Sequence, residues 1–246
     1  MAIMVDGVKR EILNIYRQDI HKFGGRLRHR IESIWDELPA SLSRHEKRFK
    51  PGDVEPGLKM RDIKEAFHWL QEARTVNLAY NVTDPNVGLK MTMDGFALKG
   101  YLSDTGLLIS HAFDENELAA AEIHRRILFD RIELNEGMLM ENVVCQMIVA
   151  SGRKAYFYSR IDPNKADERM EIDFLLAKTK TGRHKNIVPI EVKSARRFTQ
   201  VSLDKFRRKF HSYIDKPTVL DVKDRRIVDD VVYLPLYAAP AMLEIV

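Results

Sequence analysis

The sequence has little of what secreted and membrane-spanning proteins need. Its 246 residues include a single cysteine, Cys145, so no internal disulfide can form. No apolar run reaches the roughly 20 residues that span a bilayer, because the longest candidate, "VVYLPLYAAPAMLEIV", contains Pro235, Pro240 and Glu244. The first residues, "MAIMVDGVKREILNIYRQDI", reach charged side chains too early for a signal peptide. We therefore expect a cytoplasmic protein without a membrane partner.

Two common functional motifs are also missing. The eight histidines show no spacing typical of a zinc site. The chain has no G-x-x-x-x-G-K-[ST] motif, since "GDVEPGLKM" has the wrong spacing and no strand before it. Neither a zinc site nor ATP hydrolysis is predicted from these residues.

Positive charge is concentrated in one stretch of the chain. The net charge is only +4, yet Lys178–Lys209 holds eleven Lys or Arg against two acids. Such an excess attracts polyanions, although a solvated basic face has the same composition. The candidates for contacts with nucleic-acid phosphates are Arg196, Arg197, Arg207 and Arg208.

Residues 1–133 are predicted to form a mainly helical part with one short sheet. Apolar residues at helical spacing predict helices around residues 12–20, from Arg28 to Leu38 before Pro39, at 63–73 and at 114–131. "TVNLAYNV" and "GFALKGYLS" read as two strands. A helix followed by two strands predicts a winged-helix-like unit, which would serve DNA binding or else packing and dimerisation.

Residues 134–246 are predicted to form a second, α+β (or α/β) domain of order α-β-β-β-α-β-β. The expected elements are a helix at 134–150, strands at 154–159, 170–178 and 186–193, a helix at 202–212, and strands at 218–222 and 230–236. Pro189 lies in the third strand and is interpreted as the start of its paired segment.

Ionisable residues interrupt the apolar pattern of this second domain. Alternation places Ile172 and Phe174 on one strand face with Asp173 pointing away from it. In the next strand Glu191 and Lys193 share a face. If the two strands pair, these three side chains can converge. Glu141 lies at the edge of the apolar stripe of the preceding helix and can reach a neighbouring sheet.

Carboxylates that converge repel one another unless a cation neutralises them. Carboxylate oxygens suit Mg²⁺ or Mn²⁺, so Asp173, Glu191 and Glu141 are the candidate metal ligands. A bound ion could polarise a phosphoryl group and lower the pKa of a water, while Lys193 could orient that water or stabilise charge. The constellation is fit for phosphodiester hydrolysis.

This arrangement resembles the PD-(D/E)XK nuclease superfamily. The pattern of that superfamily is a helical Glu, an Asp on the second strand, and Glu-x-Lys on the third. Here those residues are Glu141, Asp173 and "EVK" at 191–193, and the resemblance implies that Glu141, Asp173, Glu191 and Lys193 are catalytic. The order of elements also agrees with a restriction-endonuclease-like domain.

A second resemblance covers most of the chain. "YRQDI", "LPASLSRHEKRF", "HWLQEARTV", "LKGYLSDTGLL", "GMLMENVV", "MEIDFLL" and "VPIEVKS" follow one another as in the domain of unknown function 4143. In that family the region follows an AAA-type ATPase module, which implies an ATPase partner in cis or in trans. The chain is then either the C-terminal part of a longer protein or a natural short form.

Three interpretations remain open. The first is a metal-dependent nuclease or nuclease-like domain that acts on DNA. The second is a non-catalytic module that binds nucleic acid or a partner and regulates the ATPase. The third is a structural domain in which Asp173, Glu191 and Lys193 form a buried ion-pair network, which perturbs pKa values without catalysis. The sequence does not fix the oligomeric state.

Overall fold

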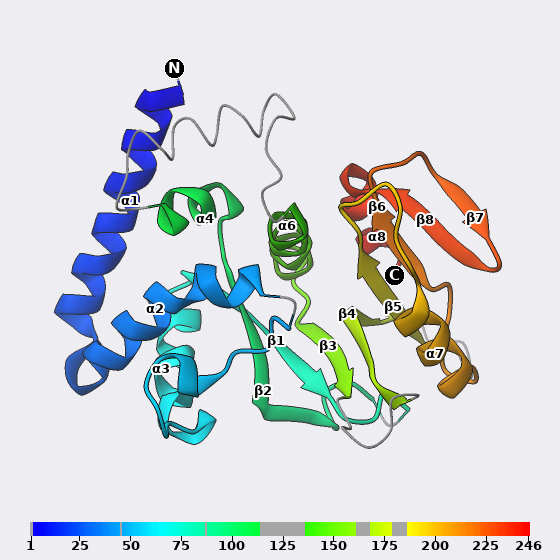
Figure 1. Cartoon of the computed structure of the whole chain (residues 1–246), viewed down its shortest axis with the longest axis horizontal. Helices are drawn as coiled ribbons and strands as arrows, with labels where there is room; N and C mark the ends of the chain where they lie inside the picture. The colour runs from blue at the N-terminus through cyan, green and yellow to red at the C-terminus, as the bar shows by residue number, and fades with distance from the viewer. Residues whose placement is uncertain (1, 45, 87, 114–135, 161–167, 179–185) are drawn as a thin grey trace. The chain divides into compact units, whose positions relative to one another are not determined.

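The computed structural model describes residues 2–44, 46–86, 88–113, 136–160, 168–178 and 186–246 (Figure 1). The helix predicted at 114–131 lies outside this part of the chain. The chain forms two compact units: unit 1 comprises Met1–Leu78 and Lys99–Gln146, and unit 2 comprises Ala79–Leu98 and Met147–Val246. Strands β1 (Val76–Val82) and β2 (Met93–Leu102) contribute residues to both units.

Unit 1 contains the predicted helices of the first part. These are α1 (Ala2–Phe23), α2 (Arg28–Ser43) and α3 (Met60–Glu72), with short 3₁₀ turns at Gly25–Leu27 and Pro51–Asp53. Unit 1 also holds α4 (Thr105–Ala112) and most of α6 (Glu136–Ala150), the helix predicted to begin the second part. The apolar stripe of α3 is buried, as its helical spacing predicts, through Ile63, Ala66, Phe67 and Leu70. The helical N-terminal part is therefore confirmed, and α4 is an element that the sequence pattern did not predict.

Helix α2 does not stop at Pro39, as predicted, but continues through it to Ser43. A proline inside a helix leaves the carbonyl four residues earlier without its backbone donor, and here that carbonyl belongs to Trp35. The Nε2 of His111 donates a hydrogen bond of 2.8 Å to the Trp35 carbonyl, and the two rings stack with centroids 4.7 Å apart. A partner from α4 thus replaces the bond that Pro39 removes.

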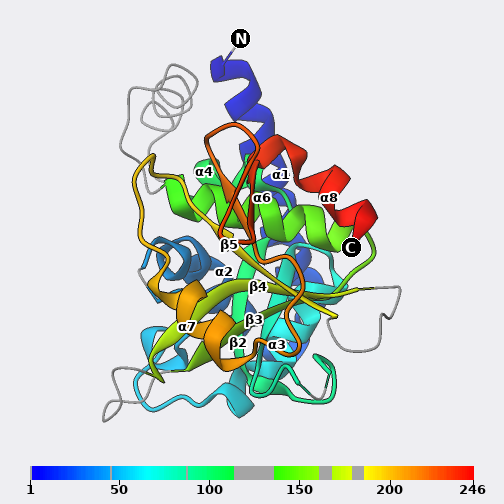
Figure 2. The same cartoon turned by 90° about the vertical axis from the view of Figure 1, so that its right-hand side faces the viewer.

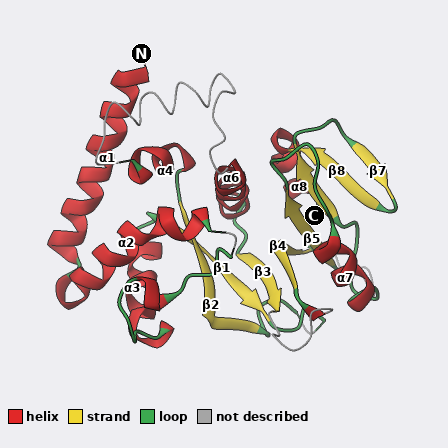
Figure 3. Ribbon diagram, in the orientation of Figure 1, coloured by secondary structure: helices red, strands yellow, loops and turns green. Residues whose placement is uncertain are grey.

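One eight-stranded mixed sheet runs in the order β2-β1-β3-β4-β5-β6-β8-β7. The further bounds are β3 Ala155–Arg160, β4 Met170–Ala177, β5 Ile187–Val192, β6 Thr218–Asp221, β7 Arg226–Val228 and β8 Val231–Pro235. β3, β4 and β5 pair antiparallel, whereas β5, β6 and β8 pair in parallel (Figure 3). β1 and β2 are neighbours, as expected of a wing, but they extend the large sheet because β1 also pairs with β3.

The predicted order of the second part is confirmed. Helix α6, strands β3 to β5, helix α7 (Val201–Lys209) and strands β6 and β8 follow one another as expected, and the short strand β7, a 3₁₀ turn at Leu236–Ala238 and helix α8 (Ala239–Ile245) are additional. The interpretation of Pro189 as the start of the paired segment is wrong for β4, because Ile187 and Val188 already pair with that strand. Pairing with β6 begins one residue after Pro189, at Ile190. Pro189 therefore lies before the residues that pair with β6, and that pairing does not need the backbone N–H that proline lacks.

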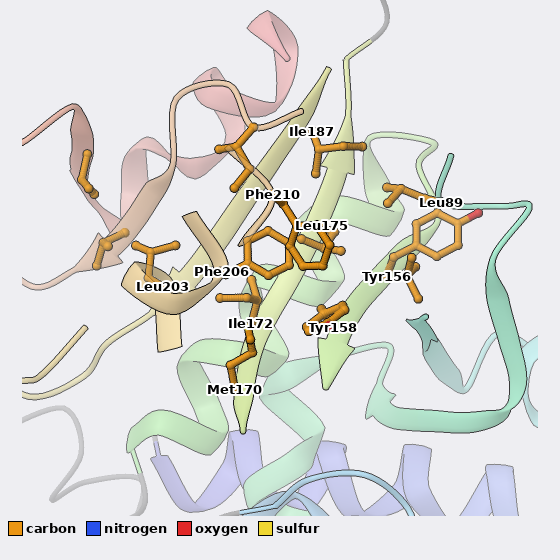
Figure 4. Close-up of a cluster of buried hydrophobic side chains, with 14 of the residues drawn as sticks. Leu89, Tyr156, Tyr158, Met170, Ile172, Leu175, Ile187, Leu203, Phe206 and Phe210 are labelled. Atoms are coloured by element: carbon orange, nitrogen blue, oxygen red, sulfur yellow. The ribbon is translucent and has the colours of Figure 1, made fainter. Parts of the chain in front are cut away.

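The core of unit 2 forms between α7 and one face of the sheet (Figures 2 and 4). Leu203, Phe206 and Phe210 come from α7 and the turn after it, and they pack on side chains of β3, β4, β5, β6 and β8. The α7 face of the sheet is hereafter the face that carries Leu175, Val219 and Tyr233. No helix among the described residues is long and apolar enough to cross a membrane.

Candidate functional site

Glu191 is a buried carboxylate on the α7 face of the sheet. It pairs in register with Val219 of β6, whose side chain belongs to the core under α7. Only 2% of Glu191 is exposed, and its Oε2 lies 2.6 Å from the Nζ of Lys193. Residues two apart on a strand share a face, so the short Glu-x-Lys spacing itself creates this ion pair. Burial makes the pair important, because a buried carboxylate needs a compensating charge.

A β-bulge in β4 sets the position of Asp173. The pairing with β3 shifts register there, so Asp173 and Phe174 both lie opposite one residue of β3, Phe157. On either side of them, Ile172 and Leu175 both pack into the α7 core. The prediction that Ile172 and Phe174 share a face is therefore wrong, because the bulge inserts a residue into the alternation. Bulges are common next to active sites, where they redirect a side chain.

The carboxylate of Asp173 is fixed against β5. Its Oδ2 accepts a hydrogen bond of 2.8 Å from the backbone N–H of Val192. The regular β4–β5 pairing ends at Phe174↔Ile190, so the side chain acts as an acceptor where the backbone ladder stops. Asp173 thus contacts the residue that lies between Glu191 and Lys193 in the chain.

Glu141 has partners of its own within unit 1. It is a buried residue of α6 whose Oε1 forms an ion pair with Lys47 and whose Oε2 accepts a hydrogen bond of 3.3 Å from the hydroxyl of Tyr101. Unit 2 holds Asp173, Glu191 and Lys193, and unit 1 holds Glu141. Within the described ranges, no group of three or more His, Cys, Asp or Glu residues is arranged to hold a metal ion.

Asp221, which is fully buried at the end of β6, is not among the residues predicted from the sequence to form the site. Its Oδ2 accepts a hydrogen bond of 2.5 Å from Arg226, and its Oδ1 accepts one of 2.9 Å from the backbone N–H of Lys223. The hydrogen bond that Arg226 donates to Asp221 raises the pKa of Arg226 above its ordinary value. One feature of the sequence could have indicated this ion pair. Asp221 ends the apolar run "TVLD", and basic residues follow it closely.

Arg226, the partner of Asp221, also lines a basic cavity. Its guanidinium lies over the ring of Tyr233, 4.0 Å from the centroid, and the Tyr233 hydroxyl is hydrogen-bonded to Gln200. The cavity has a volume of about 330 Å³ and is lined by Arg196, Arg197, Phe198, Gln200, Lys223, Arg226, Val228 and Tyr233. Four of these side chains are cationic, and the lining contains no acid.

The four arginines predicted to bind nucleic acid do not share one cavity. Arg207 and Arg208 line a different hollow of about 890 Å³, together with Asp204, Asp215 and Asp230. Arg207 donates a hydrogen bond of 2.6 Å to the carbonyl of Asp229 and lies 3.8 Å from Asp204. The acids around this second hollow offset its basic charge, so Arg196 and Arg197 have the more positive surroundings.

Cys145, in unit 1, is buried in α6 and is not suited to act as a nucleophile. Burial is the largest cause that raises the pKa of its thiol, and Glu141 raises it further, while Lys99 lowers it. A thiol attacks only as the thiolate, so the raised pKa keeps the side chain inert at neutral pH. This agrees with its interpretation as a buried helical cysteine.

Comparison with known proteins gives two matches to families, one for each half of the chain. Residues 136–238 match the family described as Domain of unknown function (DUF4143), which confirms the predicted resemblance over that range. Residues 3–117 match a second family, Domain of unknown function (DUF8612). No curated protein and no solved structure matches the chain. The chain therefore resembles DUF4143 in its second half and DUF8612 in its first.

Proposed function

We propose that the second half of this chain is a divalent-metal-dependent phosphodiesterase, a nuclease that acts on DNA. The observation that carries the proposal is the grouping of three ionisable side chains around Val192. The carboxylate of Asp173 accepts the Val192 N–H at 2.8 Å, and Glu191 and Lys193, on either side of Val192, form an ion pair at 2.6 Å.

Asp173 and Glu191 are the residues that would hold Mg²⁺ or Mn²⁺. Mg²⁺ is commonly bound by one or two protein carboxylates, with water and substrate phosphates completing its coordination. The donor set fits, since two carboxylates lie beside Val192 and the Oδ1 of Asp173 accepts no hydrogen bond from the described part of the chain. When bound, the ion would polarise a phosphoryl oxygen and lower the pKa of a bound water.

Lys193 would act on the substrate and not on the ion. Its side chain is 26% exposed, so the ammonium can turn from Glu191 toward solvent. There its three donors can bind a phosphate oxygen and stabilise the negative charge that develops during hydrolysis. Arg196 follows Lys193 by three residues in the loop to α7 and would bind the DNA backbone.

Cleavage of labelled DNA tests this proposal. Wild-type protein should cut linear, branched or single-stranded DNA with Mg²⁺ or Mn²⁺ and stop when EDTA is added. Asp173→Asn should abolish cleavage, whereas Glu171→Gln, two residues earlier on the same strand, should retain it. If Asp173→Asn cuts as well as wild type, the site is not the one proposed.

The second candidate is a non-catalytic regulatory module for an ATPase in cis or in trans. It is favoured by the ion pairs Glu191–Lys193 and Glu141–Lys47, each of which neutralises a buried carboxylate without an ion. In this case the wild-type protein would neither cut DNA nor gain thermal stability from Mg²⁺, while DNA or the ATPase would still bind. Measuring cleavage and melting temperature on the same preparation separates the two candidates.

A further inference from the structure

We propose that the cavity lined by Arg196, Arg197, Lys223 and Arg226 is a phosphate-binding subsite that holds one phosphate of a nucleic-acid strand. The inference rests on the proposed function and adds to it a fixed anchor for the substrate. The cavity, of about 330 Å³, presents four cationic side chains and no acid. That composition suits a compact anion with several acceptor oxygens.

Three of the four cations are not neutralised by any acid in the part of the chain that the structure describes. Within the described residues, the side chains of Arg196, Arg197 and Lys223 form no ion pair. Arg226 is different, because it forms an ion pair with Asp221, a residue that does not line the cavity. The excess positive charge of the subsite therefore comes from Arg196, Arg197 and Lys223, and an anion is the ligand that would offset it.

The guanidinium of Arg226 is held in a fixed position in the subsite. It is held by the fully buried Asp221 and by the ring of Tyr233, 4.0 Å away. Tyr233 is in turn hydrogen-bonded to Gln200, which also lines the cavity. A guanidinium that is already ordered loses little conformational freedom when it binds a phosphate, so binding is stronger than for a free side chain.

The subsite and Glu191 lie on the same face of the sheet. Glu191 pairs in register with Val219, and Val219 pairs with Tyr233, so the three positions lie side by side across β5, β6 and β8. Two strand spacings separate Glu191 from Tyr233, about 10 Å. A DNA strand with one phosphate in the cavity can therefore present a neighbouring phosphodiester bond to Glu191 and Lys193.

Binding without metal tests the subsite independently of catalysis. The probe is a short fluorescent single-stranded DNA with a 5′-phosphate, titrated by anisotropy in EDTA. Arg196→Gln combined with Lys223→Gln should weaken binding by about tenfold or more, since each removes a charge-assisted contact. Both side chains are exposed and form no ion pair with the residues that the structure describes, so folding should be unaffected. Arg225→Gln is the matched control, because Arg225 precedes Arg226 but lines an apolar cavity with Val188 and Val232.

The form of the probe identifies the source of the phosphate. Tighter binding of the 5′-phosphorylated strand than of the same strand with hydroxyl ends supports a terminal phosphate, and equal binding with the same loss in the double variant supports an internal one. Inorganic phosphate should compete with the DNA probe for wild-type protein and should not compete in the double variant.

Equal affinity of the double variant and Arg225→Gln for the DNA probe would overturn the proposed subsite, as would a polyglutamate peptide that binds as tightly as DNA. Loss of cleavage with this binding intact would instead reject only the proposed catalytic function.

Discussion

Asp173 on β4 and Val192 on β5 are joined by a hydrogen bond from the Val192 N–H to the Asp173 carboxylate, 2.8 Å long, at the end of the regular β4–β5 ladder. The bulge in β4 removes the backbone acceptor from this position, and the side chain supplies one in its place. The carboxylate of Asp173 thus completes the sheet, and in the proposed function its second oxygen would bind the metal ion.

This relationship predicts different results for two substitutions of Asp173. Asp173→Asn keeps an acceptor for the Val192 N–H and should leave the free energy of unfolding within about 1 kcal/mol of wild type. Asp173→Ala leaves that N–H unpaired and should cost about 1–3 kcal/mol. Urea unfolding measures both. Equal stabilities of the Asn and Ala variants would contradict the structural role of the carboxylate.

The ion pair between Glu191 and Lys193 predicts rescue by metal. Lys193→Ala removes the counter-charge of a buried carboxylate, for which about 3–5 kcal/mol is typical, and the partial exposure of Lys193 should reduce that cost. Because an ion on Glu191 would supply the missing charge, Mg²⁺ should raise the melting temperature of Lys193→Ala more than that of wild type. Glu191→Gln with Lys193→Ala should show no such gain, and an equal response of all three proteins would argue against an ion at Glu191.

Asp221 and Arg226 form an ion pair whose loss should strongly destabilise unit 2. Arg226→Gln leaves a fully buried carboxylate uncompensated and should destabilise the protein by about 3–5 kcal/mol. Asp221→Asn with Arg226→Gln removes both charges and should recover much of that loss. A double-mutant cycle in urea measures the coupling, and additive effects would show that the two side chains do not depend on each other.

The raised pKa of Cys145 predicts how stability changes with pH. The folded thiol keeps its proton where the unfolded thiol, with a pKa of about 8.5, loses it. Below the pKa of the unfolded thiol, the stabilisation that comes from keeping Cys145 protonated is fully present. As the pH rises above that pKa, the free energy of unfolding should fall. Cys145→Ala should show less of this fall. In native protein the thiol should react slowly with a disulfide reagent, and rapid reaction would mean that the side chain is accessible.

The hydrogen bond from His111 to the Trp35 carbonyl predicts a coupling with Pro39. His111→Ala leaves that buried carbonyl without a donor and should cost about 1–3 kcal/mol, in addition to lost ring packing. In a Pro39→Ala background the helix can donate its own N–H to the carbonyl, so the same substitution should cost less. Thermal unfolding of the four proteins measures this difference, and an equal cost in both backgrounds would reject the explanation.

The sequence by itself determined the elements of the second half and one contact of the site. Strand and helix periods depend on neighbouring residues, so β3, β4, β5, α7, β6 and β8 follow from the apolar pattern. The Glu191–Lys193 pair is equally local, because residues two apart on a strand must share a face. The same reasoning found the apolar stripe of α3.

Only the tertiary structure decided what depends on partners far away in the chain. The bulge at Asp173 arises from pairing with β3, and the continuation of α2 through Pro39 depends on His111, more than 70 residues later. The pairing of Asp221 with Arg226, and the separation of Arg196 from Arg207 into two cavities, follow from how β6, β7, β8 and α7 pack. Local sequence sets which side chains a strand or helix presents, but register and packing between distant segments decide which of them meet.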